Sequence, residues 1–350
     1  MANYTGNCTT HGPDIFASAL NWATSNGARI INHSYCTGTG PDPNAHDIFF
    51  DYKARVSPYP LVAASAGNGF QNNVCNKLRN GLSVGGTLEL NGSSQRALAF
   101  VDNKSWKNGT SDEAGYEVPH LTAISENVDT AGYTPGTTFV NWGGTSAAAP
   151  QVAGIVASLH EANTALESWP EVLVPGMMVA ADEDTDGTVL NLNDSTDDRD
   201  GAGLVSAWRA AEVLIAGAKV NGGNSPIRAG HDYGSLTSGG TPAQSFYSEQ
   251  YNARVPNGKQ LRSAFFAQTR PTCPSNPGSW SCSPNPYPHI ATVVYDGANI
   301  VGLAWNTNTN YSYVAFTNTS GTQKDYVLKM YLIGWNGLTS TTFGMAWSSY

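Results

Sequence analysis

The chain has 350 residues, of which 18 are Lys or Arg and 27 are Asp or Glu, so its formal net charge is −9. Nucleic acids and anionic membrane surfaces are held by clustered basic side chains, and the few basic residues here are spread thinly, which disfavours both partners. The apolar share of 40% is enough for a sizeable core.

No membrane-spanning segment is expected. The longest mostly apolar stretch, 147–159, is too short to cross a bilayer and is interrupted by Pro150 and Gln151. The first residues have neither the basic region nor the apolar region of a signal peptide.

The first part of the chain alternates between strand and helix patterns. Apolar residues at helical spacing and strand-like apolar runs follow one another along the chain. The predicted helices are 14–26, 146–159 and 206–216, and the predicted strands are 29–34, 61–68, 81–86 and 120–124. Such alternation predicts an α/β fold with a mostly parallel sheet and flanking helices.

The pattern changes after residue 218. Residues 219–241 are rich in Gly and Ser and are typical of a linker or loop. Alternating runs at 291–295, 313–316 and 326–332, separated by turn signals, then predict an antiparallel β-sandwich. We therefore predict two domains, 1–218 and 219–350.

The five cysteines favour disulfides over a zinc site, because they show no CxxC spacing and no Cys/His cluster. Cys273 and Cys282 flank a short loop and are the expected pair. The odd number means that one thiol is free or that Cys8, Cys36 or Cys75 has its partner outside the chain. Disulfides indicate a secreted protein.

The strongest chemical signal is Ser146, which follows a Gly-containing turn at the start of an apolar helix. This position directs the hydroxyl outward, beside the backbone N–H groups of the first helical turn, as a nucleophile requires. The alternative is that Gly-Thr-Ser only caps the helix. Asn68, after a buried strand, has an amide that can stabilise an oxyanion, or it merely completes a turn with Gly67.

In this order, these pieces resemble the subtilisin-like serine proteases, the subtilase family. Residues 144–154 match the family pattern G-T-S-x-x-x-P-x-x-x-G, and Asn68 falls on the family's oxyanion asparagine. The resemblance covers roughly residues 3–216 and implies Ser146 as the nucleophile, with its backbone N–H and Asn68 as the oxyanion hole. It further implies a substrate-binding edge made of Ser34, Tyr35, Cys36 and Gly67.

The family's catalytic Asp and His are expected to be missing from the chain. In subtilases they precede the segment that matches residues 14–26, and only thirteen residues stand before it here. His11 and Gly12 lack the Thr-His that follows in the family's His-Gly-Thr-His helix, so His11 is not expected to be the base. His33, on its strand, is expected to face away from Ser146. Without the missing segment, strand 29–34 would be an unpaired edge that invites self-association or the lost segment.

Three functions follow from these features. The first is peptide-bond hydrolysis by an incomplete subtilase whose Asp and His lie on a missing piece, since a serine needs a base to act as a nucleophile. The second is hydrolysis of esters or polyesters through Ser146, served by water or another histidine. The third is non-catalytic binding of a polymer or carbohydrate by exposed aromatics. The candidates for such a platform, which alternatively pack the sandwich core, are Trp280, Trp305, Trp335 and Trp347.

No organic cofactor is implied, but one segment has the spacing of a calcium loop. Residues 182–187 read Asp-Glu-Asp-Thr-Asp-Gly, in which alternate carboxylates and a Gly turn can surround one cation. The twelfth position is Asn193 where such loops carry Glu, and a solvated acidic loop is the alternative. The one metal that the sequence suggests is therefore a structural calcium ion at this loop.

Overall fold

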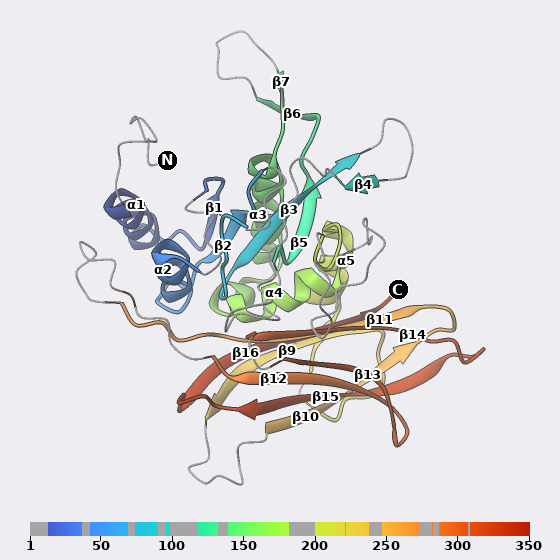
Figure 1. Cartoon of the computed structure of the whole chain (residues 1–350). Helices are drawn as coiled ribbons and strands as arrows, with labels where there is room; N and C mark the ends of the chain where they lie inside the picture. Colours follow the sequence, from blue (N-terminus) through green and yellow to red (C-terminus); the bar gives the residue numbers. More distant parts are fainter. Residues whose placement is uncertain are drawn as a thin grey trace.

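The computed structural model describes residues 13–36, 43–68, 74–89, 96–98, 118–131, 139–181, 200–220, 222–237, 247–273, 282, 287–306 and 309–350. An α/β layer lies on one side of the molecule, and two stacked antiparallel sheets lie on the other (Figure 1). The combination of a parallel sheet, flanking helices and a C-terminal sandwich confirms the predicted fold class.

The α/β layer is built on a parallel sheet with the order β1-β2-β3-β5. Its strands are β1 (Ile30–His33), β2 (Leu61–Ser65), β3 (Leu82–Glu89) and β5 (Leu121–Ile124), and the short β4 (Arg96–Leu98) runs antiparallel to the end of β3. All four parallel strands fall on the predicted ones. Among the described residues β1 pairs only with β2, so it forms an edge of this sheet.

Helices cover both faces of the sheet, as the alternation along β2 shows. Leu61 and Ala63 contribute to the main core that includes α3 (Thr145–Ala162). Val62 and Ala64 contribute instead to a cluster with α1 (Pro13–Ser25) and α2 (Ala45–Lys53). Successive strand residues point to opposite faces, so a continuous apolar strand needs helices on both sides.

Helix α2 was missed by apolar periodicity, although a local signal for it exists. The Asn44 side chain accepts from the backbone N–H of His46 and Asp47, and Asp47 accepts in return from the N–H of Asn44. This reciprocal capping box satisfies N–H groups that the first turn leaves without partners.

The C-terminal strands form a sandwich, as predicted. One sheet has the order β10-β15-β12-β13 and the other β14-β11-β16-β9-β8. The strands are β8 (Ala218–Lys219), β9 (Ala229–Thr237), β10 (Tyr247–Val255), β11 (Gln260–Ala267), β12 (His289–Asp296), β13 (Asn299–Asn306), β14 (Tyr311–Thr317), β15 (Lys324–Gly334) and β16 (Ser340–Ser349).

The second of these sheets is a middle layer. Phe265 faces the sandwich core, whereas Phe266 faces the core of the α/β layer. The buried helix α4 (Pro170–Val179) packs against β11 and β16 from that side. Figure 1 shows α4 and α5 (Ala207–Ala211) between the parallel sheet and the sandwich. A 3-10 turn, Thr164–Ser168, precedes α4, and a π-helical turn, Glu212–Ala216, follows α5.

The three candidate tryptophans that the structure describes do not form one platform. Trp347 is fully buried in the sandwich core, Trp335 is partly buried against it, and Trp305 is 55% exposed. Trp280 lies outside the described residues. Core packing therefore accounts for part of the aromatic content of this region.

Two disulfides join described residues. Cys273–Cys282 is the predicted pair, and Cys36 is bonded to Cys75. The expectation that Cys36 or Cys75 could have a partner outside the chain was therefore wrong, because the fold brings two residues 39 positions apart within 4.9 Å between Cα atoms. Cys8 lies outside the described residues. In the part of the chain that the structure describes, no helix combines the length and apolarity needed to cross a membrane.

Candidate active site

Ser146 lies at the second position of α3, directly after a tight turn. The turn residue Gly144 has φ +83°, a left-handed conformation that favours glycine, and no side chain caps the helix. In the first helical turn the N–H of Thr145 donates to Asn68 Oδ1 and the N–H of Ala147 to Gly144 O, whereas the N–H of Ser146 has no acceptor among the described residues. The Ser146 hydroxyl donates to the carbonyl oxygen of Ser34 at 3.2 Å, so it does not act as a helix cap.

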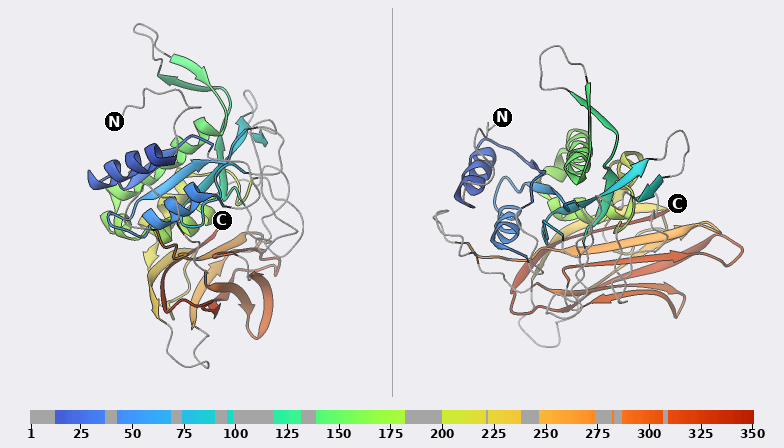
Figure 2. Two further views of the ribbon diagram at one scale, coloured as in Figure 1. Left: turned by 60° about the vertical axis from the view of Figure 1, so that its left-hand side comes forward. Right: turned by 45° about the horizontal axis from the view of Figure 1, so that its top comes forward.

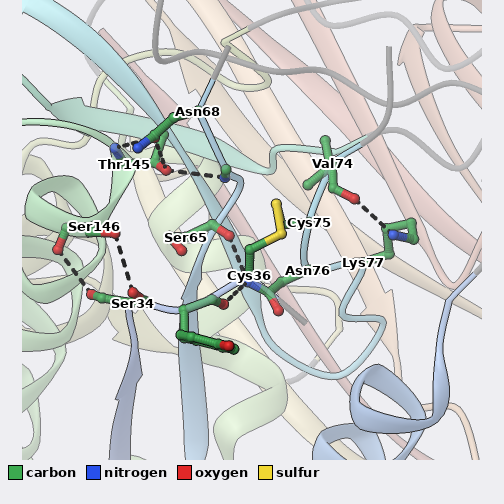
Figure 3. Close-up of a disulfide and its surroundings, with 12 residues drawn as sticks. Ser34, Cys36, Ser65, Asn68, Val74, Cys75, Asn76, Lys77, Thr145 and Ser146 are labelled. Carbon is green, nitrogen blue, oxygen red and sulfur yellow. Dashed lines mark hydrogen bonds between the residues drawn. A yellow bond between two sulfur atoms is a disulfide. The ribbon is translucent and has the colours of Figure 1, made fainter. Parts of the chain in front are cut away.

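A proline one turn later explains the return bond between these two serines. Pro150 has no N–H, so the carbonyl oxygen of Ser146 has no donor at the position where the helix would provide one. The Ser34 hydroxyl donates to that oxygen at 2.9 Å. The reciprocal pair, visible in Figure 3, joins the segment after β1 to the start of α3.

The side chain of Asn68 is held in one orientation by Thr145. Both the backbone N–H and the hydroxyl of Thr145 donate to Asn68 Oδ1, at 3.0 Å and 2.8 Å. A backbone N–H can only donate, so the accepting atom must be the amide oxygen. Among the described residues no acceptor contacts Asn68 Nδ2, and the residue is exposed, so this donor is available to a ligand.

Thr145 is held in turn by the strand end. Its hydroxyl oxygen accepts from the backbone N–H of Gly67 at 3.0 Å, and Thr145 is fully buried. The side-chain amide of Asn68 also packs closely against the Gly144 turn, because a Cβ at Gly144 would lie 2.7 Å from Asn68 Nδ2. A close approach and a positive φ thus both require glycine there.

The predicted substrate edge lies beside these groups. Ser34, Tyr35 and Cys36 continue from β1, and Gly67 continues from the neighbouring strand β2. The side chain of Asn76 links the two strand ends, because its Nδ2 donates to Tyr35 O at 2.9 Å and to Ser65 O at 2.7 Å. Of the predicted site residues, Ser34, Gly67 and Asn68 contact the start of α3 directly, and Tyr35 and Cys36 follow Ser34 along the chain. Figure 3 shows Ser34 and Asn68 beside Ser146 and Thr145.

A cavity of about 580 Å³ adjoins Ser146. It lies between the start of α3 and a hairpin formed by β6 (Val128–Ala131) and β7 (Phe139–Trp142). The views in Figure 2 show this hairpin projecting from the body of the protein. The lining residues are Val128, Asp129, Thr130, Ala131, Val140, Trp142, Ser146, Ala147, Pro150 and Gln151.

Among the described residues, no histidine forms a hydrogen bond with Ser146 Oγ. His33 contacts Phe16 and Phe50 of the helices that cover the sheet face opposite α3, as predicted, and burial lowers its pKa to about 4. His120 is buried at the start of β5, accepts from the Ser83 N–H through Nδ1, and has its pKa lowered to about 3 by burial. His160 lies fourteen residues further along α3 than Ser146, about 21 Å at the rise of a helix.

Sequence reasoning missed the residues that hold the site in place. The role of Thr145 had one usable signal, its position between the turn glycine and Ser146. Asn76 and Cys75 had none, because their contacts are made across the sheet. His11 and the acidic segment 182–187 lie outside the described residues. Among the residues that the structure describes, no group of three or more His, Cys, Asp or Glu is placed to hold a metal ion.

The chain is similar to several solved structures of proteases and a macrocyclase. Fervidolysin from Fervidobacterium pennivorans, a keratinolytic enzyme related to subtilisin, is 18% identical with a TM-score of 0.43, over 90% of this chain and 38% of its own. The prenylagaramide maturation protease PagA is 19% identical with a TM-score of 0.43, over 60% of this chain and 71% of its own. The PatG macrocyclase in complex with peptide is 23% identical with a TM-score of 0.42, over 59% of this chain and 57% of its own.

At these identities and TM-scores, the solved structures inform neither substrate nor mechanism, and the chain spans little more than a third of fervidolysin. A comparison with curated protein sequences finds no match. The family model of the subtilases, in contrast, matches residues 5–203, more than half of the chain and all of the site described above. The chain therefore belongs to the subtilase family of serine protease-type hydrolases.

Proposed function

We propose that this chain cleaves peptide bonds by acyl transfer to Ser146. The Ser146 hydroxyl attacks the substrate carbonyl and loses its proton to a base, the leaving amine takes a proton, and water then releases the acyl group. The observation that carries this proposal is the clamp of Thr145 on Asn68 Oδ1, which leaves Asn68 Nδ2 as a donor beside the turn that precedes Ser146.

The oxyanion would be stabilised by two donors. These are Asn68 Nδ2 and the backbone N–H of Ser146, which has no acceptor among the described residues of the first turn of α3. One such donor contributes roughly 10²–10³ in rate. Its position is fixed before substrate binds, so no reorganisation is needed during the reaction.

The substrate is proposed to be an extended polypeptide. The backbone of Ser34, Tyr35 and Cys36 follows an edge strand, which can pair with an added strand. Gly67 would form the opposite wall. We propose no organic cofactor and no nucleic-acid or membrane partner, in keeping with the net charge of −9.

The base is proposed to come from outside the described residues. The hydrogen bond of Ser146 Oγ goes to a backbone carbonyl, which cannot accept the proton permanently, and no described imidazole forms a hydrogen bond with that oxygen. A segment carrying the family's Asp and His would dock at the β1 edge. Two disulfides among the described residues support a protein that works outside the cytoplasm.

Ester hydrolysis is the second candidate. It is favoured by the same observation, that no described imidazole contacts Ser146 Oγ, because activated esters need less help from a base than peptides do. Water would then accept the proton, and Asn68 would still stabilise the oxyanion.

Labelling with a fluorophosphonate tests both candidates. The purified full chain is treated with the probe and its intact mass is measured, beside Ser146→Ala and beside Ser158→Ala, an exposed serine on the same helix. We expect one adduct that is lost only in Ser146→Ala. An adduct that survives Ser146→Ala, or no adduct on a folded chain, refutes hydrolysis by this chain. Turnover of an activated ester without any peptide cleavage would favour the second candidate.

A further inference from the structure

The ends of β1 and β2, which form the proposed substrate edge, are tied together beside Ser146. Cys36 is bonded to Cys75, and the Cys75 backbone N–H donates to Ala66 O at 2.7 Å. The next residue, Asn76, bridges the carbonyls of Tyr35 and Ser65. Cys75 and Asn76 are 2% and 0% exposed, so they fill the space between the strand ends (Figure 3).

The sulfur of Cys75 lies directly against the backbone of Gly67. A Cβ at Gly67 would lie 2.3 Å from Cys75 Sγ and 3.1 Å from its Cβ. Even a methyl group is too large for this side of Gly67 unless the disulfide moves. The disulfide therefore limits the depth of any pocket between the two strand ends.

The direction of the substrate follows from the two proposed contacts. In the binding mode of the proposed function, the reactive carbonyl oxygen would lie at Asn68 Nδ2, which follows β2, and the substrate backbone would run along Ser34, Tyr35 and Cys36, which follow β1. The side chain of the residue that carries this carbonyl would then point between the two strand ends. There it would meet the Cys75 sulfur and the Asn76 amide.

We propose that the Cys36–Cys75 disulfide is a specificity determinant that restricts the residue on the acyl side of the cleaved bond to a small side chain, Gly, Ala or Ser. This inference rests on the proposed function for the direction of the substrate. It adds the substrate class, because larger side chains would have to displace a buried, covalently closed segment. A misfit of even one methylene in a pocket changes discrimination by about 10–200-fold.

Peptide binding tests the proposal without requiring turnover. Fluorescein-labelled pentapeptides of four alanines and a final Gly, Ala, Val or Phe are titrated into the full chain with Ser146→Ala, and the dissociation constants are measured by fluorescence anisotropy. We expect the affinity to fall with side-chain size, and the Ala-ended peptide to bind at least about tenfold more tightly than the Phe-ended one. Equal affinities, or tighter binding of the Phe-ended peptide, overturn the proposal.

Removing the disulfide separates its effect from that of the surrounding groove. In Cys36→Ala/Cys75→Ala we expect the ratio of the two affinities to fall below about threefold, whereas the matched control Cys273→Ala/Cys282→Ala keeps it. An unchanged ratio in a folded double variant overturns the proposal, and so does a folded parent that binds none of the peptides. If the double variant does not fold, Cys36→Ser/Cys75→Ser takes its place, and an unchanged ratio in that folded variant overturns the proposal.

The result is distinguishable from a failure of the proposed function. Fluorophosphonate labelling of Ser146 without any size preference refutes only the role of the disulfide. A clear size preference without labelling supports the role of the disulfide and refutes hydrolysis by this chain.

Discussion

Replacing Thr145 by Val tests whether this residue positions the oxyanion donor. The substitution keeps the shape of the side chain and removes the hydroxyl, which donates to Asn68 Oδ1 at 2.8 Å and accepts from Gly67 N–H at 3.0 Å. The backbone bond from Thr145 N to Asn68 Oδ1 at 3.0 Å remains. Asn68 therefore keeps one of two restraints, and the buried N–H of Gly67 loses its acceptor.

The structure sets the size of both effects. An unsatisfied buried donor and the loss of the associated hydrogen bonds should lower the free energy of unfolding by about 2 kcal/mol. Complete loss of the oxyanion donor costs roughly 10²–10³ in rate. With one restraint of two left, we expect labelling of Ser146 by a fluorophosphonate to slow by roughly tenfold, a part of that limit.

The assay is the second-order rate constant of labelling, with urea unfolding measured on the same samples. Thr145→Ser keeps the hydroxyl and should restore most of the rate. Because Thr145 acts through Asn68, Thr145→Val should have little effect on labelling when Asn68 is already Ala. An equal slowing by Thr145→Val in both backgrounds would refute the positioning role, and an unchanged stability would refute the account of the Gly67 N–H.

Three further predictions concern the turn, the edge and the buried imidazole. Gly144→Ala should slow labelling of Ser146 by about 10²-fold, because the new Cβ would displace the side-chain amide of Asn68. The control Gly154→Ala should leave the rate unchanged, because a Cβ there has no heavy atom within 4 Å. Equal labelling rates for the two variants would contradict this prediction. Ser34→Ala should lower the free energy of unfolding by about 1 kcal/mol, because Ser146 O loses its donor. The loss should be smaller in a Pro150→Ala background, where the backbone N–H of residue 150 can donate to Ser146 O. Urea unfolding that gives the same loss in both backgrounds would disprove this account. His33 has its pKa lowered by burial to about 4 from 6.5, so the unfolded chain binds a proton that the folded chain does not, and stability should fall as pH drops below 6.5 towards 4. At pH 5, His33 alone should lower the free energy of unfolding by about 2 kcal/mol relative to neutral pH. In His33→Phe, urea unfolding should no longer show this part of the pH dependence. The same dependence of the free energy of unfolding on pH in the variant would rule the prediction out.

Most of the architecture was predictable because it is encoded locally. Apolar runs and turn signals predicted the four parallel strands, α3 and the sandwich strands β12, β14 and β15. The prediction of a linker or loop over 219–241 was wrong, because that segment contains the nine-residue strand β9, which pairs with β16. The G-T-S-x-x-x-P-x-x-x-G pattern and Asn68 identified the candidate nucleophile and oxyanion donor. The short loop between Cys273 and Cys282 predicted their disulfide. Each of these inferences depends on neighbouring residues alone.

The sequence by itself therefore determined the family, the fold class and the identity of the candidate reactive groups. Only the tertiary structure decided how they are held, because the contacts join residues far apart: Ser34 with Ser146 across 112 positions, and Asn68 with Thr145 across 77. It also decided that Cys36 pairs with Cys75 and that one sandwich sheet shares its face with α4. Such partners depend on how helices and sheets pack, and no local periodicity specifies that packing.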